Sequence, residues 1–264
     1  MKRLTTGTAL KVIRASFILQ SKERMVQEVY LFTLIYQPIL FTILTVGTYL
    51  FGGKPNFGLF AITGAGMVGI WNNNLWSSGE IVDHERGSGT LSLLIASPTP
   101  LLLVLLGKSL ANAVTSILAM GITFATGAIV YQLPLGIQDP AGFAFGLILT
   151  VIALTCLGLV IGSLFVLSRN TGYVMNVANY PIYLLSGLTV PLTLLPLWSH
   201  PLSNALAPTW GNLVLNQAAG SLPGSTLTSF AWLAGLSLVY LLIAFGLYKR
   251  VEYRAREAGN LEMW

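Results

Sequence analysis

The chain has 264 residues, of which 54% are apolar and only 9% are charged, and its mean hydropathy is +0.73. Soluble domains carry about 25% charged residues, so this composition excludes an ordinary soluble domain and indicates an integral membrane protein. The formal net charge of +5 does not indicate a nucleic-acid partner, because the basic residues lie at the ends of apolar segments, where anionic lipid attracts them.

Residues 4–24 form a basic segment that precedes the first apolar run. Leu10, Ile13 and Phe17 recur at helical spacing, and basic residues lie towards the other side of that helix. This pattern favours an amphipathic helix lying along the cytoplasmic membrane surface. A solvated basic leader is the alternative interpretation.

Six later segments are long and apolar enough to be read as membrane spans. We predict an all-α integral membrane protein whose six transmembrane helices cover Val29–Phe51, Phe57–Trp76, Leu101–Tyr131, Ala141–Leu167, Gly172–Leu188 and Leu227–Tyr248. The connections are too short to bury a core of their own, so residues 1–264 are expected to form a single transmembrane domain.

The basic residues predict the orientation of these spans. Of the 14 Lys and Arg residues, only Lys54 falls in a loop on the side opposite to the basic leader. Cytoplasmic loops carry an excess of Lys and Arg, so both termini are expected in the cytoplasm.

The segment 189–225, between spans five and six, contains five prolines and two tryptophans but no Lys, Arg, Asp or Glu. It is too interrupted by proline for a straight span and too apolar for an ordinary loop. Irregular backbone at membrane depth requires packing against protein or a wet cavity. We therefore predict an outer re-entrant hairpin here.

The cytoplasmic loop 77–100 holds four of the 23 charged residues and one of the two histidines. Asp83, His84 and Glu85 are adjacent in sequence and would point in different directions on a helix, which does not favour a catalytic cluster. Gly107-Lys108-Ser109 lacks the glycine five residues upstream that a phosphate-binding loop needs. We therefore expect no ATP, metal or other cofactor to be bound by this chain.

Polar side chains inside the spans are costly to bury and are the candidates for a substrate pathway. These are Asn72 near the end of span two, and Asn176, Asn179 and Tyr180 in span five. Hydrogen bonding between helices is the alternative role for the two span-five asparagines, and the sequence leaves the choice open.

The run from Glu85 to Pro98, with Glu85-Arg86, Gly89-Thr90-Leu91, Leu93-Leu94 and Ser97-Pro98, resembles the cytoplasmic signature of the ABC type 2 export permeases. Ser186-Gly187, Pro191, Leu195-Pro196 and Pro208 resemble the outer region of the same family. Ser88 is an extra residue in the signature, and Ser92 stands where an acidic residue is common.

The resemblance implies that two membrane subunits, identical or similar, pair with two copies of a separate ATP-binding subunit that holds ATP and magnesium. It implies a prokaryotic inner-membrane location and contact with membrane lipid. The segment Ser88–Ile95 would be the coupling helix that docks on the ATPase. Its expected contact residues are Glu85, Arg86, Thr90, Leu91, Leu94 and Ile95.

The function expected from the resemblance is export of an amphiphilic cargo such as a drug, lipid, glycan or peptide. A stand-alone ion-coupled carrier or channel is the main alternative, and it would require internal ionisable residues or inverted repeats. A membrane enzyme is a third possibility, which would depend on residues 83–85.

Overall fold

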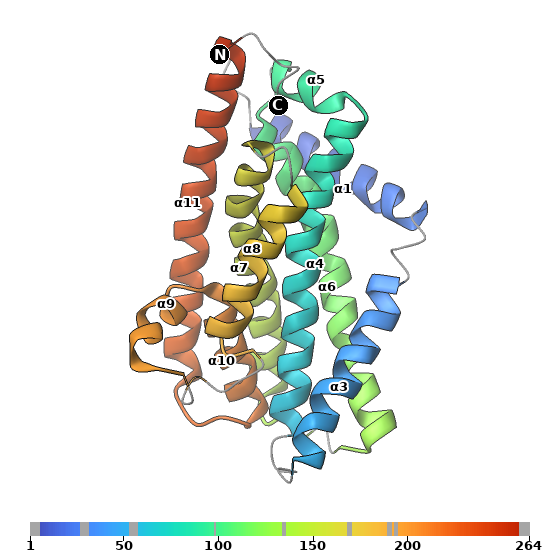
Figure 1. Cartoon of the computed structure of the whole chain (residues 1–264), viewed down its shortest axis with the longest axis vertical. Coiled ribbons are helices and arrows are strands. Elements are labelled where there is room, and N and C mark those ends of the chain that lie inside the picture. Colours follow the sequence, from blue (N-terminus) through green and yellow to red (C-terminus); the bar gives the residue numbers. More distant parts are fainter. Residues whose placement is uncertain are drawn as a thin grey trace.

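We describe a computed structural model of the chain over residues 6–26, 32–52, 58–97, 99–133, 136–167, 171–188, 192 and 195–258. Within these ranges the chain is almost entirely helical and forms no strand, which confirms the all-α prediction. The long helices run side by side in one elongated bundle (Figure 1).

Four helical segments are long and apolar enough to cross a membrane, and they match four of the predicted spans. They are Leu34–Phe51, which comprises most of the π-helical turn η1 (Phe32–Tyr36) and α3 (Gln37–Phe51), and α6 (Leu101–Tyr131), α7 (Pro140–Leu167) and α11 (Thr226–Ala258). The remaining two predicted spans correspond to α4 (Gly58–Gly87) and α8 (Thr171–Leu185). α8 has only 15 residues and α4 contains three consecutive asparagines, so a total of six spans stays a prediction.

The central helix of the bundle is α4, which packs along α6, α3 and α7. Its first half is buried on every side, including Ile62, Met67 and Trp71. α4 does not end where span two was expected to end, near Trp76, but continues as one helix to Gly87. The first part of the expected loop 77–100 is thus helical. The helix can continue there because no proline or turn sequence interrupts residues 77–86.

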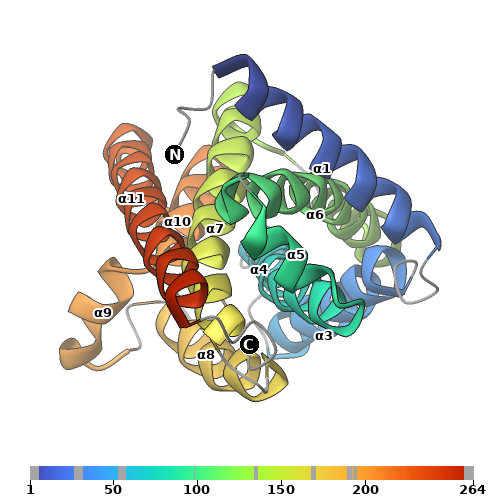
Figure 2. The same ribbon diagram turned by 90° about the horizontal axis from the view of Figure 1, so that it is seen from above.

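The helix α1 (Thr6–Val26) lies across the outside of α6, as seen from above in Figure 2. A helix is thus confirmed for the basic segment, although its position at a membrane surface stays a prediction. Gly107 of α6 allows the close approach, because a Cβ atom there would lie 2.5 Å from the carbonyl oxygen of Ile13. The face of α1 turned towards the bundle carries Ser16, Gln20 and Arg24, whereas Leu10 points outward.

The proline-rich segment 189–225 folds into the 3₁₀ turn η4 (Leu197–Ser199), α9 (His200–Asn204) and α10 (Ala207–Ala219). α10 is buried against α7, α11 and α4, and Asn212 donates a hydrogen bond of 2.9 Å to the Gly187 carbonyl at the end of α8. Residues 189–191, 193 and 194 lie outside the described residues. The re-entrant path of this segment through a membrane stays a prediction.

Candidate functional site

The short helix α5 (Thr90–Ala96) lies at one end of the bundle, close to the C-terminal end of α11 (Figure 1). It corresponds to the segment Ser88–Ile95 expected from the sequence. Gly89 has a φ of 70°, a left-handed conformation that lets α4 stop and α5 start within two residues. At the other end, Ser97 is extended, as expected for a residue before proline, and its hydroxyl donates to the Leu94 carbonyl at 2.8 Å.

Glu85 anchors the start of α5 from the last turn of α4. The Thr90 hydroxyl donates to a carboxylate oxygen of Glu85 and, at 3.1 Å, to the Glu85 carbonyl. The second carboxylate oxygen lies 2.6 Å from the ammonium of Lys108 on α6. Burial favours the protonated acid, but the hydrogen bonds from Lys108 and Thr90 outweigh it and lower the pKa of Glu85.

Lys108 was not among the residues that the sequence singled out for this site, yet it is 1% exposed. Its ammonium also lies 3.1 Å from a carboxylate oxygen of Glu23 on α1. The lysine therefore joins α6 both to α1 and to the end of α4. The local sequence around Lys108 gives no signal for this pairing, since Glu23 and Glu85 are distant in the chain.

Arg86 also turns back towards the bundle. Its guanidinium donates to the carbonyl oxygens of Phe165 and Val166, at 3.1 and 3.2 Å, in the last turn of α7. A cation in this place satisfies carbonyl groups that have no partner within the helix and interacts favourably with its dipole. Arg86 thus fixes the α4–α5 turn to α7, and Glu85 fixes it to α6.

The apolar residues of α5 divide between the bundle and the surface in a way that the sequence did not indicate. Leu91, expected to contact the ATPase, is only 3% exposed and belongs to the core, and Leu94 packs partly against that core. Leu93, which was not selected, is 69% exposed. The side chain of Ile95 lies outside the described residues. Of these three leucines, Leu93 is the one whose side chain is exposed at the surface.

A hydrogen-bonded network extends from α1 across the bundle. Arg24 donates to the Asn73 side chain at 3.2 Å, and Asn73 donates to the Ser116 hydroxyl at 2.7 Å. Asn74 also donates to Ser116, at 3.4 Å, and accepts from the Thr155 hydroxyl at 3.1 Å. Of the three consecutive asparagines in α4, only Asn72 was expected from the sequence to have a functional role. The network connects α1, α4, α6 and α7.

Asn72 and Asn179, both assigned to a candidate substrate pathway, meet at the contact between α4 and α8. The Trp71 indole donates to the side-chain amide oxygen of Asn179 at 2.8 Å, and Tyr183 interacts with the side chains of both Asn72 and Asn179. Asn72 itself is buried. In this structure, these two amides hold helices together.

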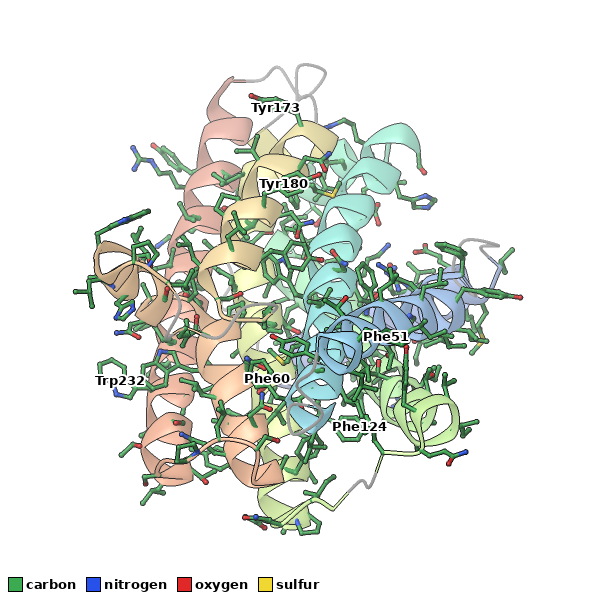
Figure 3. The ribbon with its side chains drawn as sticks, turned by 60° about the horizontal axis from the view of Figure 1, so that its bottom comes forward. Phe51, Phe60, Phe124, Tyr173, Tyr180 and Trp232 are labelled. Atoms are coloured by element: carbon green, nitrogen blue, oxygen red, sulfur yellow. The ribbon has the colours of Figure 1, made fainter. Side chains whose placement is uncertain are left out.

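Asn176 and Tyr180 lie on the outward face of α8 instead. Asn176 is exposed and donates to the Gly172 carbonyl of its own helix at 2.9 Å, and Tyr180 is 66% exposed. Tyr173 is exposed on the same helix, and Figure 3 shows both tyrosines along α8. The structure therefore separates the two span-five asparagines, one inside the bundle and one on its surface.

The apolar helices, with a polar turn and the short helix α5 at one end, are those of a helical membrane protein. The family description "ABC-2 type transporter" matches residues 12–218. This match covers well over half of the chain, so the chain belongs to the ABC-2 type transporter family. It represents the membrane permease of such a transporter, and not the ATP-hydrolysing subunit.

Two curated relatives are similar to part of the chain. They are described as "Probable multidrug ABC transporter permease YbhR" of Escherichia coli strain K12 and of Escherichia coli O157:H7. Each is 30% identical over 122 residues, which make up 46% of this chain and 33% of the relative. The matched region thus spans about a third of the length of these relatives.

Proposed function

We propose that this chain is the membrane subunit of an ATP-driven exporter and receives the mechanical work of ATP hydrolysis through α5. The observation that carries this proposal is the construction of the α4–α5 turn. Three side chains in this turn, Glu85, Arg86 and Thr90, bind back to the bundle, while Leu93 is left exposed. A rigidly mounted helix with one exposed apolar side chain is suited to insertion into a groove of a partner.

The proposed assembly has two copies of the ATP-binding subunit and two membrane subunits, either two copies of this chain or this chain and a similar permease. ATP and magnesium would bind on the partner. All six predicted helices, including α4 and α8, would cross a prokaryotic inner membrane with both termini in the cytoplasm and α1 on the lipid surface. The described chain supports this topology, since α5 and the C-terminal end of α11 lie at one end of the bundle and α1 lies in the same half (Figure 1).

The proposed cargo is amphiphilic. The relatives are described as probable multidrug permeases, and the outward face of α8 presents the ring and amide groups of Tyr173, Asn176 and Tyr180. Tyrosine combines an apolar body with a polar tip, which suits a molecule of mixed polarity. In a pair of permeases working by alternating access, this face would line the space between the two subunits.

The test is reconstitution of the chain in proteoliposomes, with and without a candidate ATP-binding subunit from the same genome, using the amphiphilic dye Hoechst 33342 as the probe. We expect ATP hydrolysis and ATP-dependent dye movement only when both subunits are present. Hydrolysis by the purified chain alone would contradict the division of labour. Dye movement by the chain alone, driven by an ion gradient, would support the stand-alone carrier instead.

A further inference from the structure

Lys108 lies where three elements of the chain meet. Its ammonium contacts Glu85 in the last turn of α4 and Glu23 on α1, while Lys108 itself belongs to α6. Glu85 is buried, and Glu23 keeps 27% of its side chain exposed. One buried cation thus ties two peripheral elements, α1 and the α4–α5 turn, to the same helix.

The same carboxylate serves α5 directly. Glu85 accepts from the Thr90 hydroxyl with one oxygen and contacts Lys108 with the other. Thr90 is the first residue of α5, a helix of seven residues, which is too short to be stable without tertiary contacts. The position of α5 relative to α6 is therefore linked to Lys108 through a single carboxylate.

The contact with α1 is equally close. Gly107, next to Lys108, faces the backbone of Ile13 and the Cβ atom of Ser16. A slide of α1 along α6 would separate Lys108 from Glu23 and leave the buried ammonium with Glu85 as its one carboxylate partner among the described residues. Loss of one partner from a buried ion pair is strongly destabilising, so movements that keep both contacts are favoured.

We propose that Lys108 is a positioning residue that makes α5, α1 and the adjoining part of α6 move as one body when the ATP-binding subunit acts on α5. This inference rests on the proposed function, because it assigns the route by which movement of α5 enters the bundle. Without the shared lysine, α5 would shift against α1 and the movement would be lost at the surface.

The experiment measures the distance between spin labels on α1 and α5 in the complex with the ATP-binding subunit. Ala15 and Ala96 are exposed positions on these helices, and each is replaced by cysteine for labelling in a Cys156→Ala background. The distance distribution is recorded without nucleotide and with ATP in EDTA, which prevents hydrolysis. With Lys108 intact, we expect the same distance in both states.

The main variant is Lys108→Met, which keeps the length of the side chain and removes its charge. We expect ATP to shift or broaden the distance distribution beyond its nucleotide-free width. Lys22→Met is the matched control, since Lys22 is an exposed cation beside Glu23, and it should behave as the unsubstituted chain does.

A triple variant separates positioning from simple neutralisation of buried charge. Lys108→Met combined with Glu23→Gln and Glu85→Gln leaves no unpaired carboxylate, so it should regain thermal stability even if Lys108→Met alone does not fold. We expect its label distance still to change with ATP. An unchanged distance in the triple variant would overturn the inference, as would a nucleotide-dependent distance in the chain with Lys108 intact. If the chain with Lys108 intact does not bind the ATP-binding subunit at all, that result would instead contradict the proposed function.

Discussion

The ammonium of Lys108 lies 2.6 Å from a carboxylate oxygen of Glu85, in a place where both side chains are almost fully buried. This contact joins the eighth residue of α6 to the last turn of α4, which leads into α5. Because the lysine also contacts Glu23, the end of the bundle that carries α5 is held by charge as well as by apolar packing.

The ion pair predicts a specific response to acid. The pKa of Glu85 is lowered from its ordinary value of 4.5, so the ionised form stabilises the folded chain above that value. This contribution should be constant near neutral pH and decline as the pH falls below about 4.5 through the folded pKa. Thermal unfolding in detergent between pH 7 and 3.5 should therefore show that the melting temperature of the wild-type chain falls more steeply with acid than that of Glu85→Gln. Equal acid dependence of the two proteins would contradict the geometry of this pair.

The turn between α4 and α5 predicts opposite effects for two glycines that lie two residues apart. Gly89 has a positive φ and open space around its Cα, so Gly89→Ala should cost about 1–2 kcal/mol from backbone strain alone. Gly87 is the last helical residue of α4 and also has open space, so Gly87→Ala should be neutral or slightly stabilising. Thermal melting of both variants checks this. A stable Gly89→Ala protein would show that α5 is not held by this turn.

The two asparagines of α8 should respond differently to the same substitution. Asn179→Leu removes the acceptor of the Trp71 indole and should destabilise the chain by about 0.5–2 kcal/mol. Asn176 lies on the outward face, so Asn176→Leu should change the free energy of unfolding of the chain by less than about 0.5 kcal/mol. If α8 lines the cargo route, Asn176→Leu should instead alter which amphiphilic compounds stimulate ATP hydrolysis by the complex. Equal loss of stability in both variants would remove Asn176 from the proposed pathway.

The sequence was most informative where physical constraints are local. Long apolar runs gave α6, α7 and α11 to within a few residues at their starts, because a membrane helix satisfies its own backbone groups and needs little else. Likewise, Gly89 and the residues before Pro98 marked the two ends of α5 to within two residues. The sequence predicts a loop from residue 77, whereas α4 continues to Gly87, because charged residues such as Glu85 and Arg86 are compatible with an exposed helix end.

The contacts of the site could not be read from the sequence. The partners of Lys108 are 23 and 85 residues away from it in sequence and meet only through packing. In α5, apolar residues occupy most of the seven positions, so no periodicity distinguishes the buried Leu91 from the exposed Leu93. Asn176 and Asn179 are three residues apart, and that rotation of about 60° is enough to separate the bundle side of α8 from its surface.

The central claim, that α5 is the element on which the ATP-binding subunit docks, is tested most directly by co-purification of that subunit with three variants. Leu93→Asp places a charge on the exposed apolar side chain of α5, and Leu10→Asp places one on an equally exposed leucine of α1. Leu91→Asp buries a charge in the core and should lower stability rather than docking alone. The account predicts that Leu93→Asp inserts and melts as the wild type does but loses the ATP-binding subunit, while Leu10→Asp retains it. Normal recovery of that subunit with Leu93→Asp would contradict the account.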